Sequence, residues 1–124
     1  MIVHTILYVA DQARSTAFYK KTMQLEPSLN VPGMTEFKLS ESHVLGLMPE
    51  SGIKKLLGDK LPDPKAGNGI PRVELYIKVK NPEIYLSRSL GAGAVVVSEI
   101  KPRDWGDSAG YVLDPDGHVL AFAC

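Results

Sequence analysis

Cysteine is almost absent from this sequence, and its scarcity excludes two common ways of stabilising a small protein. The only cysteine among the 124 residues is Cys124, at the last position. One thiol supports neither a disulfide framework nor a cysteine-based zinc site. We therefore expect a reducing compartment, the cytoplasm. With 44% hydrophobic residues, the chain is long and apolar enough to build a core in one domain.

An excess of charge of one sign is also missing. Fourteen basic residues balance 14 acidic ones, so the formal net charge is +0. Proteins bind a phosphate backbone through a surplus of Lys and Arg, and this balance argues against nucleic acid as a partner. A net charge near zero instead favours association between copies of the chain.

Long apolar runs are the third absence. No stretch reaches the roughly 20 apolar residues that a membrane-crossing helix needs. Residues 1–4 also lack the charged segment and following apolar run of a signal peptide. We therefore expect no membrane partner.

Hydrophobic patterning divides the chain into two similar halves. Runs rich in β-branched and aromatic residues predict strands, and Asp11 is placed as the cap of a helix. The first half predicts a strand at 2–9, a helix at 12–23, and strands at 25–31, 35–39 and 44–48. The second half predicts a strand at 72–79, a helix at 82–91, and strands at 94–98, 109–113 and 118–123.

A fixed offset of 70 residues relates the two halves. The octapeptide 4–11 aligns with 74–81, and each runs directly into a helix. Similarity at one offset indicates a duplicated unit. The domain 1–124 then consists of module one (about 1–50), a Gly- and Pro-rich connector (about 51–70) with one helical turn at 53–57, and module two (about 71–124).

Side-chain alternation separates two faces of each module's first strand. In the second module an aliphatic face that includes Leu75 and Ile77 should pack beneath the helices, and Leu7 takes that position in the first module. The opposite face receives His4, Tyr8, Glu74 and Tyr76. Aromatic rings mixed with single titratable groups suit a small-molecule pocket. The other interpretation is an open sheet face whose polar groups meet water.

Several motifs, in order, resemble the vicinal-oxygen-chelate superfamily of glyoxalases, extradiol dioxygenases and bleomycin-resistance proteins. They are the segment 4–11 followed by Phe18-Tyr19, then Leu90-Gly-Ala-Gly93, Trp105-Gly-Asp107 and Asp114-Pro-Asp-Gly117. The resemblance covers nearly the whole chain. It implies an α+β fold in which two βαβββ modules form a curved mixed β-sheet around a cleft, with helices on the outer face. It also implies a homodimer.

The resemblance also locates four positions that carry metal ligands in glyoxalase I and similar enzymes. They fall on His4, Gly46, Glu74 and Ala121 of this sequence. Gly46 and Ala121 have no coordinating side chain, and His4 with Glu74 is too small a set to hold a divalent ion firmly. We therefore expect no metal and no other cofactor.

The favoured function is metal-independent binding of a small, partly aromatic organic molecule, as in bleomycin-resistance proteins. Tyr8, Phe37, Tyr76 and Trp105 would supply stacking and apolar contact, while His4 and Glu74 would supply hydrogen bonds. Whether the chain is an enzyme stays open. The alternative is a glyoxalase-class lyase or isomerase with Glu74 as general base and a weakly held divalent metal at His4. A third possibility, a pure interaction module, predicts no enclosed cavity.

Two residues, His4 and Trp105, have competing interpretations from the sequence alone. His4 contacts the ligand or is a hydrogen-bonded remnant of an ancestral site. Trp105, the only tryptophan, contacts a ligand or a second subunit, or else fills the core. His118, next to a turn, is expected to be exposed and without a role, as is His43.

Overall fold

The computed structural model describes residues 1–124 and contains eight strands and three α-helices. Its first half contains β1 (Val3–Val9), α1 (Gln12–Met23), β2 (Leu29–Val31), β3 (Met34–Ser40) and β4 (His43–Pro49). The connector contains α2 (Glu50–Leu57) and the short 3-10 turns Gly58–Lys60 and Pro64–Gly67. The second half contains β5 (Glu74–Lys78), α3 (Pro82–Gly91), β6 (Val95–Pro102), β7 (Ser108–Leu113) and β8 (Val119–Ala123).

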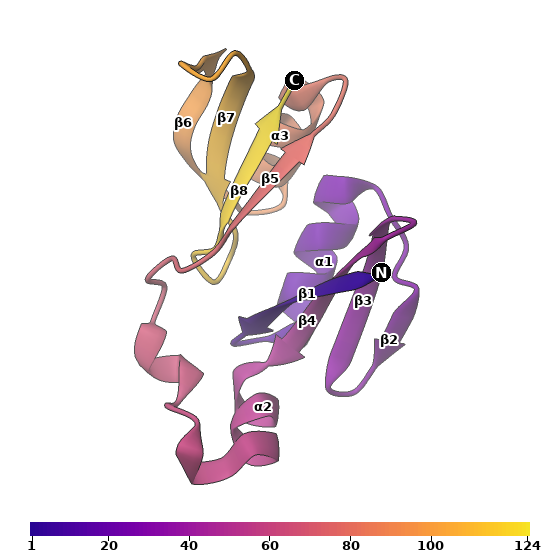
Figure 1. Ribbon diagram of the computed structural model, residues 1–124, viewed down its shortest axis with the longest axis vertical. Helices are drawn as coiled ribbons and strands as arrows, with labels where there is room; N and C mark the ends of the chain where they lie inside the picture. The colour runs from indigo at the N-terminus through magenta and orange to yellow at the C-terminus, as the bar shows by residue number, and fades with distance from the viewer.

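The strands form two four-stranded mixed sheets with the same topology. Their orders are β1-β4-β3-β2 and β5-β8-β7-β6, so each module's first strand pairs in parallel with its last. The predicted α+β class with two βαβββ modules is confirmed, although the eight strands are divided between two sheets. Figure 1 shows the two sheets in different parts of the molecule, joined by the extended connector.

Local sequence explains the helix boundaries. The Asp11 side chain accepts a hydrogen bond from the Arg14 backbone N–H at 2.9 Å, so the predicted cap of α1 is confirmed. Asn81 stands at the same place before α3 but makes no side-chain cap bond, and Pro82 supplies the favoured first-turn residue instead. The connector is more helical than expected, since α2 has eight residues.

Each sheet packs one face beneath the helices, and the two packed faces share one core. Leu7, Leu75 and Phe122 are among the buried members, and α1 packs against α3 across the junction of the modules. Ser15, Tyr19 and Thr22 recur at helical spacing along α1 and are all fully buried. Tyr19 from this stripe reaches the second module, so α1 belongs to the core of both modules.

A buried carboxylate joins the two modules. Asp114, in the turn between β7 and β8, accepts a hydrogen bond of 2.6 Å from the Tyr19 hydroxyl of α1. The same carboxylate accepts bonds from the backbone N–H groups of Asp116 and His118 and from the His118 ring Nδ1. Only 17% of the His118 side chain is exposed, so the expectation of an exposed His118 is wrong. His43 is also partly buried, 2.7 Å from the Thr5 hydroxyl.

The rest of this turn fastens onto neighbouring segments. Asp116 Oδ1 accepts a hydrogen bond from the Ala10 backbone N–H at 2.8 Å and pairs with the Arg14 guanidinium at 3.4 Å. Gly117 has φ 88° and packs against the connector so closely that a Cβ there would stand 2.5 Å from the Gly69 carbonyl oxygen. Only glycine fits at this point. The absence of a side chain at Gly117 allows the connector to lie directly against the turn.

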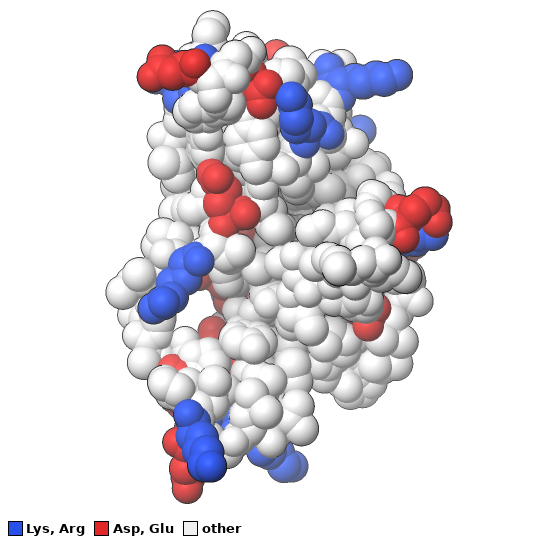
Figure 2. All heavy atoms as spheres, viewed as in Figure 1, with Lys and Arg blue, Asp and Glu red and all other residues white.

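The surface agrees with the balanced composition. Figure 2 shows Lys, Arg, Asp and Glu interspersed on the viewed face, and mainly uncharged atoms cover the region of the first sheet. None of the helices has the length and apolar character that a membrane crossing requires.

The two faces of β5 differ in what a substitution should cost. Leu75 is 8% exposed within the core, so Leu75→Ala should lower the free energy of unfolding by about 2–5 kcal/mol through cavity formation. Glu74, its exposed neighbour, should tolerate Glu74→Gln within about 0.5 kcal/mol. Urea denaturation of both variants measures this difference. Equal losses would show that Glu74 is a structural residue.

The Asp114–His118 pair should make stability depend on pH. Burial alone would lower the pKa of His118, but the hydrogen bond and charge of Asp114 outweigh it, with Asp116 and Glu50 adding to the rise. Burial alone would raise the pKa of Asp114, but the bonds from His118 and Tyr19 leave it below its usual value. Stability from the pair should therefore be greatest between about pH 4 and 6.5, because both partners are then charged.

Above this window, the contribution of His118 to the free energy of unfolding should decline as pH rises through the raised pKa of His118. Below the window, the contribution of Asp114 should decline as pH falls. Chemical denaturation of wild type and His118→Gln from pH 4 to 9 measures the alkaline loss. Wild type should lose more stability than the variant across that range. Parallel curves would contradict the assignment.

Candidate functional site

The first sheet leaves one face open, and that face carries two of the expected site residues. Tyr8 is 38% exposed and Ile6 is 42% exposed, whereas Leu7 between them is 2% exposed. The His4 side chain is 44% exposed, with its Nδ1 3.9 Å from Glu36 Oε2. The predicted alternation of side chains along β1 is therefore confirmed.

Phe37 lies on the opposite face of this sheet. It pairs with Leu45 in the β3–β4 register, and Leu45 pairs with Thr5 of β1. Paired residues point to the same side of a sheet, so Phe37 shares the packed face and is fully buried in the core. The expectation of ligand contact for Phe37 is corrected, because no ligand on the open face could reach it.

The second sheet has an equivalent open face, which carries the other three expected residues. Glu74 and Lys78 are exposed at the two ends of β5, with the partly buried Tyr76 between them. Trp105, from the loop between β6 and β7, donates its indole Nε1–H to the Tyr76 hydroxyl at 2.8 Å. Trp105 is 59% exposed, so it is neither a core residue nor fully covered.

A carboxylate that the sequence analysis did not assign completes this group. Tyr76 donates its hydroxyl hydrogen to Asp107 Oδ2 at 2.7 Å, and the Lys78 ammonium donates to Asp107 Oδ1 at 2.9 Å. The bonds from Lys78 and then Tyr76 hold the pKa of Asp107 below its usual value. Asp107 raises the pKa of Lys78 in turn. Asp107 thus remains charged in neutral solution.

The open faces belong to different sheets, so one chain does not bring all the expected residues together. His4 and Tyr8 project from β1, while Glu74 and Tyr76 project from β5 in the other sheet, with Trp105 beside it. None of these residues lines the cavity of about 600 Å³ found at the junction of the modules. A site shared by both open faces therefore requires a second chain or a rearrangement.

The structure places the four positions that the resemblance gives as metal ligands. Gly46 has no side chain, and a Cβ there would stand 3.1 Å from Ile6 Cγ1 and 3.4 Å from Met34 Sδ, a tight fit. Ala121 is fully buried and pairs with Tyr76 and Tyr111 on either side. His4 lies near Glu36, in the other sheet from Glu74. These residues do not fit a metal centre.

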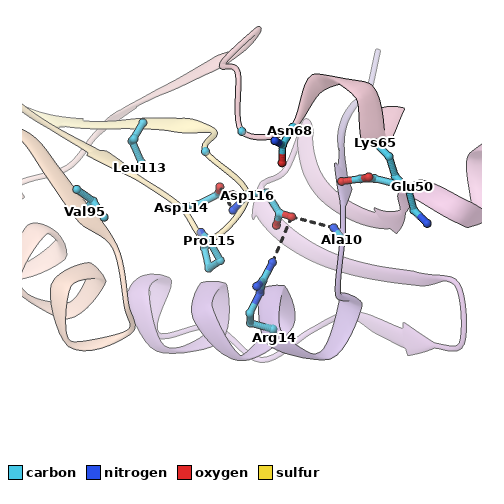
Figure 3. A pocket seen from close by; sticks show the side chains of 12 residues that line it. Ala10, Arg14, Glu50, Lys65, Asn68, Val95, Leu113, Asp114, Pro115 and Asp116 are labelled. Atoms are coloured by element: carbon cyan, nitrogen blue, oxygen red, sulfur yellow. Dashed lines mark hydrogen bonds and ion pairs between the residues drawn. The ribbon is translucent and has the colours of Figure 1, made fainter. Parts of the chain in front are cut away.

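The junction cavity is a second candidate, and the sequence analysis did not anticipate it. Figure 3 shows Arg14 rising from α1 and Asn68 pointing from the connector toward Asp116. The wall mixes polar and apolar surface, with Glu50 and Lys65 at another side and Val95 and Leu113 among the apolar members. Arg14 is already paired with Asp116, which reduces the charge left for a ligand.

A three-residue cluster beside this cavity has ligand-type atoms within 4.8 Å of one another: Asp114, Asp116 and His118. The Asp114 oxygens already accept four hydrogen bonds, which use the approximately four lone-pair sites of a carboxylate. Within this cluster, only Asp116 Oδ2 is a buried side-chain atom without a hydrogen-bond partner. These hydrogen bonds indicate that the cluster holds the two modules together. They do not favour a cation site, because a cation needs three or more free ligands.

The residues that the sequence analysis missed have contacts distant in sequence. Tyr19 and Asp114 are separated by 95 positions, and Tyr76 and Asp107 by 31. In the sequence, Asp114 and Asp107 stand in two recognisable motifs, the turn Asp114-Pro-Asp-Gly117 and the tripeptide Trp105-Gly-Asp107. These motifs mark the two carboxylates but do not indicate which distant side chains hydrogen-bond to them.

Comparison with known proteins agrees with this architecture. Uncharacterized proteins of Mycobacterium bovis and Mycobacterium tuberculosis are each 31% identical over 116 residues, covering 90% of this chain and 75% and 67% of those proteins. A glyoxalase-related enzyme from Fulvimarina pelagi superposes with TM-score 0.83 at 20% identity, covering 99% of this chain and 86% of that one.

A second solved structure gives the same result at lower identity. It is a glyoxalase/bleomycin resistance protein/dioxygenase family enzyme from Burkholderia phytofirmans, with TM-score 0.80, 14% identity and coverage of 97% and 94%. At such identities the two structures establish the fold alone. The family model described as Glyoxalase/Bleomycin resistance protein/Dioxygenase superfamily matches residues 1–122. The chain therefore belongs to the glyoxalase/bleomycin resistance protein/dioxygenase superfamily.

Proposed function

We propose that this protein binds a small, partly aromatic organic molecule without a metal ion, in the cytoplasm. The observation that carries the proposal is the composition of the open sheet faces. Exposed Tyr8 and Trp105 and the partly buried Tyr76 provide ring surface, and His4 and Glu74 provide hydrogen-bonding groups beside it. Apolar and aromatic walls with few polar groups are typical of small-molecule sites.

The metal-independent part of the proposal rests on the four ligand positions. Two of them, Gly46 and Ala121, have no side chain that coordinates a metal. Binding through ring stacking and hydrogen bonds needs no metal. Sequestration of a compound would need nothing more than such binding.

A second copy of the chain would complete the cleft. The open face of the first sheet exposes several apolar side chains: Ile6, Tyr8, Leu29 and Val31. On the second sheet Val95 is 60% exposed and Trp105 is 59% exposed. Apolar patches of this kind on a monomer commonly mark an interface, and a twofold dimer would cover both faces at once.

The competing function is a glyoxalase-class reaction with Glu74 as general base. Glu74 is exposed at the start of β5, where a bound carbon acid would be accessible to it. A general base must lie within hydrogen-bonding distance of the proton that it removes. Turnover that disappears in Glu74→Gln would favour this reaction over binding alone.

Ligand binding should be detectable as stabilisation of the metal-stripped protein. A thermal-shift screen of planar aromatic and keto-acid compounds in the presence of a chelator should give at least one aromatic hit. A compound present at 100 times its Kd should stabilise the fold by about 2.7 kcal/mol. Glu74→Gln should reduce the shift, because it removes a charged hydrogen-bond acceptor from the site.

The matched control is Glu83→Gln, which alters an exposed carboxylate on α3, away from the open faces. It should leave the shift unchanged. The proposal fails if hits appear only after a divalent metal is restored, or if near-stoichiometric metal remains with the purified protein through gel filtration.

The dimer should appear as a species of twice the 13.5 kDa chain mass in sedimentation equilibrium at micromolar concentration. Ile6→Lys should shift it toward monomer, since burying an unpaired charge in an apolar interface is costly. Ile84→Lys is the control, because Ile84 on α3 is 43% exposed against 42% for Ile6. A monomer mass for wild type, or equal effects of both variants, would contradict a dimer through the open face.

A further inference from the structure

A continuous chain of hydrogen bonds crosses the open face of the second sheet. It runs from the Lys78 ammonium to Asp107, from the Tyr76 hydroxyl to the same carboxylate, and from the Trp105 indole to that hydroxyl. The three bonds measure 2.9, 2.7 and 2.8 Å. Every member therefore depends on the position of Asp107.

The loop that carries Asp107 is fastened at its base. The Arg103 backbone N–H donates to the Asp107 carbonyl at 2.8 Å, and the Gly106 N–H donates to the Arg103 carbonyl at 3.1 Å. The Arg103 guanidinium donates to the Ala109 carbonyl and to the Ser98 hydroxyl. Trp105 lies at the free tip of this loop, where its side chain has only the bond to Tyr76 to fix it.

The hydrogen bonds of this chain occupy the donor groups of both aromatic side chains, Tyr76 and Trp105. A tyrosine hydroxyl has one hydrogen, which Tyr76 donates to Asp107, and an indole has one N–H, which Trp105 donates to Tyr76. The ring centroids lie 6.5 Å apart at 61°, in edge-to-face geometry. The pair therefore presents ring surface and no free hydrogen-bond donor.

We propose that Asp107 is the positioning residue of the binding site, and that the Tyr76–Trp105 wall it holds selects flat aromatic molecules. The inference rests on the proposed function and specifies its ligand class. Asp107 itself does not touch the ligand. It orients the hydroxyl of Tyr76 and, through that hydroxyl, the indole of Trp105. A flat ring stacks on such a wall, whereas a puckered saturated ring of equal size makes poorer contact.

The first experiment needs no ligand, because Trp105 is the only tryptophan and gives one indole N–H resonance. Asp107→Ala should speed hydrogen exchange at that indole by up to about tenfold, which corresponds to the loss of one hydrogen bond between neutral groups, the bond from the indole to the Tyr76 hydroxyl. It should also lower tryptophan fluorescence anisotropy. Asp107→Asn should restore most of both signals, since its amide oxygen still accepts from Tyr76. Asp104→Ala, an exposed carboxylate three residues earlier in the chain, should change neither.

Tyr76→Phe provides a second route to the same readout, because it removes the acceptor of the indole without altering Asp107. It should speed indole exchange as much as Asp107→Ala does. Unchanged exchange and anisotropy in both variants, with melting temperatures near wild type, would overturn the positioning role.

The second experiment tests the ligand class with two probes of equal charge and carbon skeleton. Naphthalene-2-carboxylate is flat, and decahydronaphthalene-2-carboxylate is puckered. Calorimetric titration of wild type should show tighter binding of the flat probe, and Asp107→Ala should remove most of that preference. Equal affinities, or a preference for the saturated probe, would overturn the selectivity.

The two experiments separate failure of this inference from failure of the proposed function. If neither probe binds but another compound from the screen does, the flat-ring class is overturned and the binding function stands. If no compound of any class binds, the proposed function and the ligand class fail together. The indole measurements still decide the role of Asp107 in that case.

Discussion

The buried carboxylate of Asp114 is the interaction on which the arrangement of this protein depends. It lies in a turn of the second module and accepts the hydroxyl hydrogen of Tyr19 from the helix of the first. A buried carboxylate without partners would be costly, so its four hydrogen bonds commit the turn to one position. That position places Asp116 against Ala10 and Arg14, and Gly117 against the connector. Polar contacts centred on this turn therefore help to orient the two sheets, beside the apolar core that they share.

Because both sheets pack their helix-facing sides into one core, their opposite faces remain open. These faces carry the aromatic rings of Tyr8 and Tyr76, the His4 imidazole and the carboxylates of Glu36 and Glu74 on strands, with Trp105 on the loop beside β5. Family membership agrees with a role in small-molecule binding or an enzyme-like role. At two of the four positions that the resemblance gives as metal ligands the chain has Gly46 and Ala121, which offer no coordinating side chain.

The sequence predicted what depends on local periodicity and missed what depends on distant contacts. Alternation along residues 2–9 and 72–79 was enough to separate Leu7 and Leu75 from Tyr8 and Glu74, because the period of a strand is two. Phe37 was misplaced because its side is set by its register with β4 and, through β4, with β1. His118 was expected in solvent because its burial depends on Asp114, which is held by Tyr19 from the other module. Asp107 stood in a noted motif, but its partners Tyr76 and Lys78 are 31 and 29 residues away.

The central claim is that a small aromatic molecule binds the open sheet faces of the metal-free protein. Chemical-shift mapping of the chelator-treated protein, with an aromatic hit added in steps, tests it most directly. The account predicts that the largest changes occur at Tyr8, Glu74, Tyr76 and the indole of Trp105. Changes confined to the junction cavity around Arg14 and Asn68, or no changes until a divalent metal is added, would contradict it.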